Sequence, residues 1–299
     1  MPQIDEIADI IARHVPADGM HASALPRLSL VRSFMPTVGI PTVYKPSLCI
    51  IAQGCKQVEL GGHSYIYDPA KYLAVSVDLP LTGSILEASQ ARPYLSLVLD
   101  LDLSVLSDLM LQHPFDPGPE PVGPAIGVSA MEPGLLDATL RLARLLDTPG
   151  DAGALAPLAE REILYRLLAG AQAPAIRRIA AVDSRLKQVS RAIAWLRANY
   201  AQPVSIGQLA ADVGMSPSSF HSHFKAATTL SPLQYRTRVR LQEARRMLVV
   251  EAMDAASAGF AVGYESPSQF SRDYSRLYGA PPMKDALRLR GSAEYALVA

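Results

Sequence analysis

The feature that most constrains the fold of this chain is a short sequence motif that occurs twice in its last third. "GMSPSSFHSHFK" begins at Gly214, and "GYESPSQFSRDY" begins at Gly263. Ser216 and Phe220 of the first copy recur as Ser266 and Phe270 at a constant offset. Two copies are too few for a solenoid, which needs about three repeats to bury its faces. The repeat therefore predicts a small unit that is duplicated inside one domain.

Each copy predicts a helix-turn-helix. In the first copy, Ser216 is suited to cap a helix that has Pro217 at its first position, where the missing N–H costs nothing. Gly214 supplies the tight turn before it, and an apolar helix beginning after Ser205 precedes that turn. A helix, a short glycine turn and a second helix are typical of helix-turn-helix units. We expect these units at about 205–228 and 254–278.

The segment between the copies, 231–250, predicts one long helix. At about 1.5 Å per residue it would span roughly 30 Å. Successive major grooves on one face of DNA lie about 34 Å apart. One chain could therefore present two recognition helices to adjacent grooves.

With the phenylalanines buried, the other face of each second helix carries small polar, amide and cationic side chains. Such side chains read base edges or hold phosphates. The expected DNA-binding residues are Ser218, His221, Ser222, Lys225, Ser268, Gln269, Ser271 and Arg272. The candidate phosphate contacts are Arg236, Arg240, Ser216 and Ser266. The competing interpretation is a solvated helix surface, and two equivalent helices in one domain argue against it.

The charge distribution agrees with a nucleic-acid partner. The chain of 299 residues has no net formal charge, but residues 183–299 hold 15 Lys and Arg against 9 Asp and Glu. That half therefore carries +6, and residues 1–182 carry −6. A charge split of this kind favours nucleic-acid binding by the basic half.

The first half changes from strand to helix patterns. Short β-rich runs occupy about 25–101, and Gly61-Gly62 between two of them predicts a hairpin. Helical spacing follows over about 103–170, and 171–183 reads as a linker. We expect an α+β chain with a sensing and dimerisation domain at 1–182 and an all-α DNA-binding domain at 183–299. With no apolar run long enough to span a membrane, we expect a soluble, cytoplasmic protein with no membrane partner.

Residues 186–288 resemble the DNA-binding domain of the AraC/XylS family of bacterial transcription regulators. The spacing of glycine, Ser-Pro, phenylalanine and proline carries the resemblance, which implies seven helices with two helix-turn-helix units. By motif position it places base contacts on Ser218, His221, Ser222, Ser268, Gln269 and Arg272. This sequence departs from the family pattern at "AASAGF", where Gly259 should cost the helix about 1 kcal/mol against alanine. It departs again at "TTL", 228–230, where the usual glycine is absent.

Residues 25–170 resemble the amino-terminal domain of the same regulators. The order of Pro-Ser-Leu-Cys, Gln-Gly and Tyr-Asp-Pro carries this second resemblance. It implies a cupin-like β-barrel that senses a small effector, flanked by helices used for homodimerisation. The residues proposed for an effector pocket are Tyr44, Cys49, Tyr65, Tyr67 and Tyr72. For each tyrosine, simple core packing is the competing interpretation.

The sequence offers little for catalysis, a cofactor or a metal. His63 stands alone, and no nucleophile-elbow, phosphate-loop or dinucleotide motif is present. The two cysteines, Cys49 and Cys55, are too few for a DNA-repair alkyltransferase with a four-cysteine zinc site. Beside Lys56, either thiol could be acidified and sense oxidants or electrophiles, but burial as a small apolar residue is the simpler interpretation.

We therefore expect a sequence-specific, DNA-binding transcription regulator that is not an enzyme and needs no cofactor. Its expected partners are promoter DNA, a small-molecule effector, a second copy of the chain and RNA polymerase. Two alternatives stay open. One is a constitutive DNA binder without an effector, and the other is a thiol-based sensor.

Overall fold

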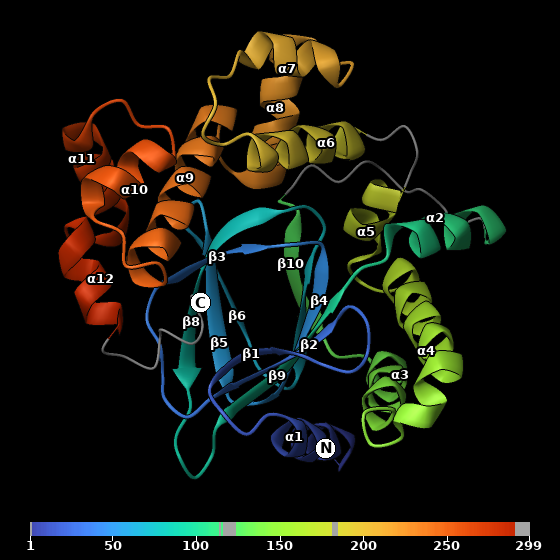
Figure 1. Cartoon of the computed structure of the whole chain (residues 1–299). Coiled ribbons are helices and arrows are strands. Elements are labelled where there is room, and N and C mark those ends of the chain that lie inside the picture. Colours follow the sequence, from blue (N-terminus) through green and yellow to red (C-terminus); the bar gives the residue numbers. More distant parts are fainter. Residues whose placement is uncertain (1, 114, 116–123, 181–184, 291–299) are drawn as a thin grey trace.

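The structure is a computed structural model, and it describes residues 2–113, 115, 124–180 and 185–290. Two antiparallel sheets form its centre (Figure 1). The six-stranded sheet has the order β1-β2-β9-β4-β7-β10, and the four-stranded sheet has the order β3-β8-β5-β6. The strands are β1 (Gly19–Ala22), β2 (Leu28–Ser33), β3 (Ile40–Tyr44), β4 (Ser47–Gln53), β5 (Cys55–Leu60), β6 (His63–Tyr67), β7 (Lys71–Val75), β8 (Leu79–Glu87), β9 (Tyr94–Asp100) and β10 (Ile126–Ala130). The expected α+β class is confirmed, although the strands form two packed sheets rather than one closed barrel.

Residue alternation explains why the sheets pack face to face. Along β4, Ser47 and Cys49 point between the sheets, while Leu48 between them faces the other way, toward α1 (Pro2–His14). Because both faces of β4 are covered, the strand reads as an unbroken apolar run. The predicted hairpin joins β5 to β6, and Gly61 and Gly62 adopt φ of 55° and 87°.

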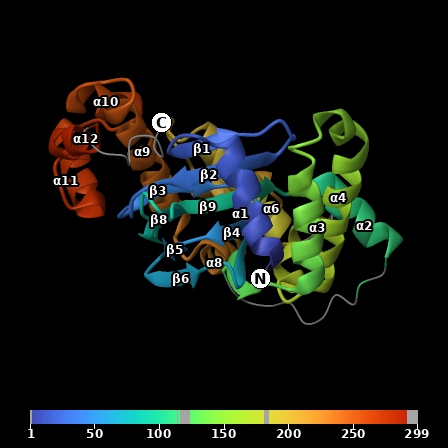
Figure 2. The same ribbon diagram turned by 90° about the horizontal axis from the view of Figure 1, so that it is seen from below.

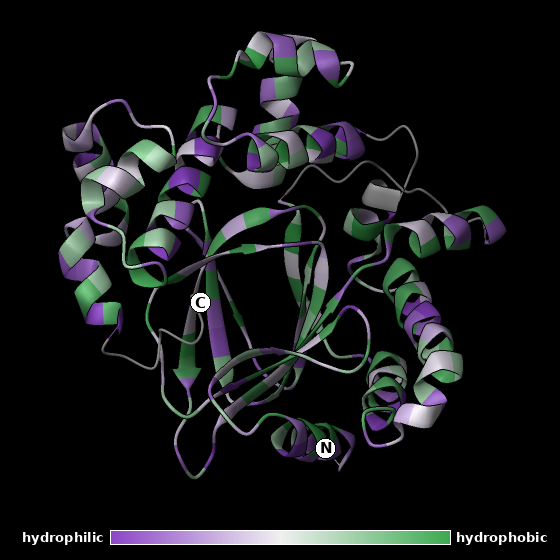
Figure 3. Cartoon of the chain, viewed as in Figure 1, coloured by the Kyte–Doolittle hydropathy of each residue, from purple (hydrophilic) through white to green (hydrophobic). Residues whose placement is uncertain are grey.

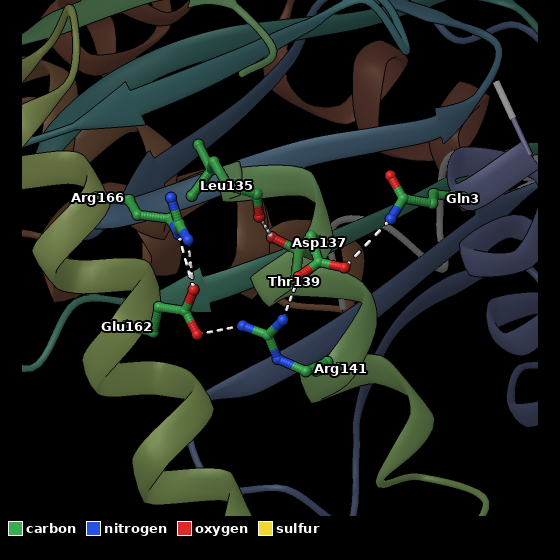
Figure 4. Close-up of polar contacts among 7 residues, drawn as sticks. All are labelled: Gln3, Leu135, Asp137, Thr139, Arg141, Glu162 and Arg166. Atoms are coloured by element: carbon green, nitrogen blue, oxygen red, sulfur yellow. Dashed lines mark hydrogen bonds and ion pairs between the residues drawn. The ribbon is translucent and has the colours of Figure 1, made fainter. Parts of the chain in front are cut away.

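Four further helices cover one side of the larger sheet: α2 (Leu103–Gln112), α3 (Pro133–Arg144), α4 (Pro149–Ala169) and α5 (Ala173–Ala180). Side-chain contacts join α1, α3 and α4 (Figure 4). Gln3 donates to Asp137, while Arg141 bonds to both Asp137 and Glu162. Arg166 donates two further hydrogen bonds to Glu162. The three helices are therefore held as one layer.

The basic half contains the seven helices that the resemblance implied, counted over the described residues 185–290. They are α6 (Arg185–Ala198), α7 (Ile206–Asp212), α8 (Pro217–Thr228), α9 (Pro232–Val249), α10 (Ala255–Ala261), α11 (Pro267–Tyr278) and α12 (Pro282–Arg290). Figures 1 and 2 place α10–α12 beyond the sheets, on the side opposite α2–α4.

Two boundaries differ from the sequence-based expectations. The strands β1 and β10 lie outside the expected core of about 25–101. Most of the expected linker at 171–183 is helix α5, whose apolar side chains Ala173 and Ile176 are buried. The predicted domain boundary at 182/183 falls outside the described residues.

Candidate nucleic-acid interface and internal cavity

The first helix-turn-helix consists of α7 and α8. Ser205 and Ser216 cap these helices by accepting hydrogen bonds from the backbone N–H groups of Gln208 and Ser219. Between the helices, Gly214 adopts a φ of 77°, a conformation that favours glycine. Phe220 and Phe224 are fully buried, with ring centroids 5.4 Å apart and the planes tilted in an edge-to-face contact. The exposed residues on the other face of α8 are Ser218, His221, Ser222 and Lys225.

The second unit, α10 and α11, repeats this arrangement. Gly263 takes the turn at φ 88°, and Phe270 and Tyr274 are buried. On the opposite face of α11, Ser268, Gln269 and Arg272 are exposed, and Ser271 is half-buried. Ser266 occupies the cap position but makes no side-chain capping bond, unlike Ser216. The eight residues predicted to bind DNA thus lie on two equivalent helices.

Gly259 has a packing role that the sequence did not reveal. A Cβ added there would lie 3.0 Å from Cγ of the Phe270 ring. Such contacts are tighter than ordinary packing allows, so the glycine lets α10 approach α11 closely. Its cost in helix propensity is therefore offset by a tighter contact between the two helices.

The two arginines predicted to contact phosphate have other partners. Arg236 donates to the backbone carbonyls of Tyr200 and Gln202. Arg240 donates to the carbonyls of Tyr200 and Ala201. These carbonyls follow the end of α6, where backbone acceptors have no intrahelical partner. Through these bonds the two arginines hold the segment after α6 to α9, and their assignment as phosphate contacts stays a prediction.

The basic half packs directly on the sheets. The Ala125 backbone N–H donates to the carbonyl of Ala227, at the end of α8, at 2.9 Å. The Tyr235 hydroxyl on α9 donates to the Asp78 carbonyl, and Arg197 on α6 pairs with the Asp78 carboxylate at 2.8 Å. The last two contacts connect α9 and α6 to the turn that precedes β8.

Thr229 occupies the position after α8 where the family pattern has a glycine. It ends α8 in the left-handed conformation at φ 60°, which is strained for a β-branched residue. The equivalent residue that ends α11 is Gly279, at φ 73°. Thr229 lies against the β5–β6 hairpin, because a Cβ on Gly61 would reach its Oγ1 at 2.0 Å. This departure from the family pattern therefore lies where the first helix-turn-helix contacts the β5–β6 hairpin.

A cavity of about 230 Å³ lies between the two sheets. Alternate residues of each bordering strand line it, as β geometry requires. The residues that line it include Thr42, Tyr44, Lys45, Cys49, Lys56, Tyr67, Gly83, Tyr94 and Asp100. Of the five predicted pocket residues, Tyr44, Cys49 and Tyr67 line this cavity. Tyr65 and Tyr72 do not, and Tyr72 instead lies near Ser129 of β10.

The thiols are poorly placed for reactivity. Cys49 is 2% exposed, and burial raises its pKa to about 11 even though Lys56 acts in the opposite direction. Burial and the Glu87 carboxylate also raise the pKa of Cys55. The acidification expected from Lys56 is therefore outweighed by desolvation of the thiolate. Both cysteines are free.

Sequence reasoning missed Lys56 and Tyr94 as cavity residues. A signal for Lys56 was present, because Lys56, Val58 and Leu60 alternate on one face of β5, and the last two are buried. A cation on the apolar face of an amphipathic strand indicates a polar interior. Tyr94 carried a similar signal, because Tyr94, Ser96 and Asp100 alternate on one face of β9 and all three line the cavity.

The described residues contain neither a membrane-spanning helix nor a metal-binding cluster. No helix there is long and apolar enough to cross a membrane. Nor do three His, Cys, Asp or Glu side chains gather there in a way that could hold a metal ion.

Comparison with known proteins agrees with both halves of this description. The model described as the AraC-type transcriptional regulator N-terminus matches residues 24–175, and a helix-turn-helix domain model matches 209–286. A Pseudomonas aeruginosa regulator, ArgR, is 27% identical over 108 residues, which are 36% of this chain and 33% of ArgR. The Klebsiella pneumoniae activator RhaS is 31% identical over 100 residues, which are 33% of this chain and 35% of RhaS. The matches thus span about a third of these curated relatives.

Solved structures share the fold over most of the chain. Wild-type ToxT from Vibrio cholerae, with an unsaturated fatty acid bound, covers 90% of this chain and 96% of its own. The TM-score is 0.55 at 11% identity. A second ToxT structure has a TM-score of 0.54 at 8% identity, covering 89% of this chain and 98% of its own. At these identities the likeness concerns the fold alone.

Proposed function

Since this chain belongs to the AraC family of transcriptional regulators, we propose that it binds promoter DNA through α8 and α11 and regulates transcription in response to a small molecule. The observation that carries the proposal is the pair of equivalent helix faces, each exposed and each polar or cationic. They are joined by α9, whose 18 residues span about 27 Å at the usual rise. Figure 3 shows hydrophilic segments along α9 between the two units.

The direct test is a titration of the purified chain against DNA from upstream of its own gene and its neighbours. A scrambled duplex of equal length is the control, and both are measured at several stated salt concentrations. Specific binding should exceed non-specific binding by about 10³-fold or more. Footprints should show two protected regions about one helical turn apart. Equal, salt-sensitive binding to both duplexes would contradict sequence-specific recognition.

We assign the effector site to the cavity between the sheets. Support comes from its lining of polar and aromatic side chains and from ToxT structures solved with an unsaturated fatty acid and with an aryl-substituted butenoic acid. A route to the DNA-binding half is available through β3. Thr42 and Val43 of this strand line the cavity and also border a second hollow beside Val239 and Gln242 of α9. A ligand that binds one arrangement of these elements more tightly would shift the population toward it. Unchanged DNA affinity across a broad metabolite screen would favour a constitutive binder.

The thiol-sensor alternative is weakened by the burial and raised pKa of Cys49. The proposal gives the chain no catalytic step. It includes RNA polymerase as the partner through which bound protein would alter transcription.

A homodimer formed through the amino-terminal half is part of the proposal. On α4, the side chains of Leu155, Leu158 and Tyr165 are 47%, 64% and 41% exposed. Their spacing of three and seven places them along one side of the helix. Light scattering should give twice the chain mass, and Leu158→Glu should shift the protein to monomer. A monomeric wild type at micromolar concentration would contradict this part of the proposal.

A further inference from the structure

The cavity between the sheets contains a cation without a counter-ion. Lys56 is half-buried, and across the described ranges its ammonium has neither an ion pair nor a side-chain hydrogen bond. By comparison, Lys71, on β7 of the larger sheet, pairs with Asp68 at 3.2 Å. A charge held away from water without a partner is costly unless something else compensates it.

The backbone directs Lys56 into the cavity. The register of β5 against β8 shifts between Cys55 and Lys56, and such bulges re-aim side chains. Gly83 on β8 leaves space for the lysine stem, because a Cβ there would lie 3.3 Å from Lys56 Cε and 3.5 Å from the Tyr44 hydroxyl. The position of the ammonium is thus built into both strands.

Aromatic rings surround this ammonium. Its nitrogen lies 5.5 Å from the ring centroid of Tyr44 and 5.9 Å from that of Tyr94, both within range for a cation–π contact. Tyr67, also a lining residue, is opposite Lys56 in the β5–β6 register. The rings hold the ammonium but do not neutralise it.

The cavity is polarised along its length. Its carboxylate, Asp100, lies six residues along β9 from Tyr94, which is about 20 Å in an extended strand. Asp100 is opposite Ser47 in the strand register, and the charge of Lys45 acts on it. Asp100 therefore lies at the end of the cavity away from Lys56. An anion beside Lys56 would therefore be attracted there and would escape repulsion from Asp100.

The size of the cavity restricts what fits. An apolar cavity of about 150 Å³ takes one benzene ring. At about 230 Å³, this cavity has room for one ring with a small substituent, or for a short chain.

We propose that the cavity binds a small carboxylate whose anionic group lies at the Lys56 ammonium and whose single aromatic ring or short apolar chain lies among Tyr44, Tyr67 and Tyr94. This inference deepens the proposed function and rests on it only in calling the ligand the effector. A charge-assisted bond in a partly dehydrated site supplies both affinity and orientation. A cationic ligand of the same shape is repelled by Lys56.

The test compares matched probes by calorimetry: benzoate with benzamide, hexanoate with hexanamide, and benzylammonium as the cation. Wild-type protein should bind at least one carboxylate in the millimolar range, about tenfold or more tighter than its neutral amide. Benzylammonium should not bind measurably. Lys56→Met should remove the preference for the carboxylate while leaving amide binding within about twofold.

Two further variants keep the result interpretable. Lys56→Arg retains the charge and should keep the carboxylate preference. Lys71→Met removes a lysine that is already paired outside the cavity, and it should bind like the wild type. Circular dichroism establishes that each variant is folded.

Each failure has its own meaning when DNA binding is measured on the same proteins. Equal binding of carboxylate and amide, a preference that survives Lys56→Met, or no carboxylate binding at all would overturn this inference, even if specific DNA binding is intact. Carboxylate binding through Lys56 without specific DNA binding would instead overturn the proposed function and leave the cavity assignment standing.

Discussion

Arg245 and Asp285 form an ion pair that is shielded from solvent and joins α9 to α12. Arg245 Nε lies 2.8 Å from Asp285 Oδ2, and Nη2 lies 3.1 Å from Oδ1. The two side chains are 4% and 0% exposed. The Tyr274 hydroxyl on α11 donates to the same carboxylate at 3.0 Å. The second helix-turn-helix is thus fastened to the linking helix by a satisfied, buried polar cluster.

Removing one member of this pair should be severe. Arg245→Met leaves Asp285 buried and short of a partner, and we expect a loss of about 3–5 kcal/mol in the free energy of unfolding. Arg246→Ala on the same helix breaks pairs with Glu243 and Glu251 that solvent can reach, and should cost at most about 1 kcal/mol. Urea titrations followed by circular dichroism measure both. Equal losses would show that burial of the Arg245 pair has no special energetic weight.

The same cluster makes stability depend on acid. Burial raises the pKa of Asp285, but hydrogen bonds from Arg245, Arg288 and Tyr274 outweigh it, and the net pKa is below the ordinary 3.8. The folded-state pKa is depressed, so its stabilisation is fully present above about 3.8 and is lost as the pH falls through the folded value. The difference in unfolding free energy between wild type and Asp285→Asn should therefore shrink between pH 5 and pH 2, roughly the range over which this linkage acts. A difference that stays constant over this range would contradict the assignment.

Two glycines with similar backbone conformations should differ in their tolerance of alanine. Gly263 has φ 88°, and a Cβ there would lie 2.2 Å from the Ala201 carbonyl oxygen. Gly279 has φ 73° and open space around it. Gly279→Ala should cost about 1–2 kcal/mol for the left-handed conformation alone. Gly263→Ala should cost clearly more, because the turn must also move away from the first unit. Thermal unfolding of both variants tests this difference.

Arg272 should contribute to base preference, whereas Arg276 should not. Arg272 is exposed on the face of α11 shared with Gln269, while Arg276 pairs with Asp273 at 3.3 Å. Arg272→Ala should weaken specific binding by about 1–3 kcal/mol and relax preference at one base position. Arg276→Ala should leave that preference unchanged. Binding to a library of single-base variants at fixed salt measures both, and identical profiles for wild type and Arg272→Ala would remove Arg272 from the reading set.

The two thiols should react at different rates. With its pKa raised to about 11 by burial, Cys49 is almost entirely protonated at pH 8, and its sulfur is covered. In the native protein, iodoacetamide should modify half-buried Cys55 well before Cys49, as measured by mass spectrometry of peptides. In denaturing urea the two rates should become alike. Rapid native modification of Cys49 would revive the thiol-sensor interpretation.

Local sequence was sufficient for the repeated units, because caps, turns and helical spacing act over a few residues. Ser216, Pro217 and Phe220 favour a helix through local interactions, and α8 begins where they predict it. The hairpin at Gly61-Gly62 is local in the same sense. By contrast, Gly259 looked like a weakness, because its partner Phe270 is visible only when α10 packs on α11.

The sequence by itself determined that this protein has a strand-rich half, a helical half with two equivalent helices that carry polar and cationic side chains, and a net positive charge on the second half. Only the tertiary structure decided what its long-range partners are. It turned Arg236 and Arg240 toward the carbonyls after α6, paired Arg245 with Asp285, and brought Lys56 beneath the rings of Tyr44 and Tyr94. The physical reason is that capping and periodicity are properties of neighbouring residues. A buried charge, in contrast, is defined by groups that arrive from other strands and helices.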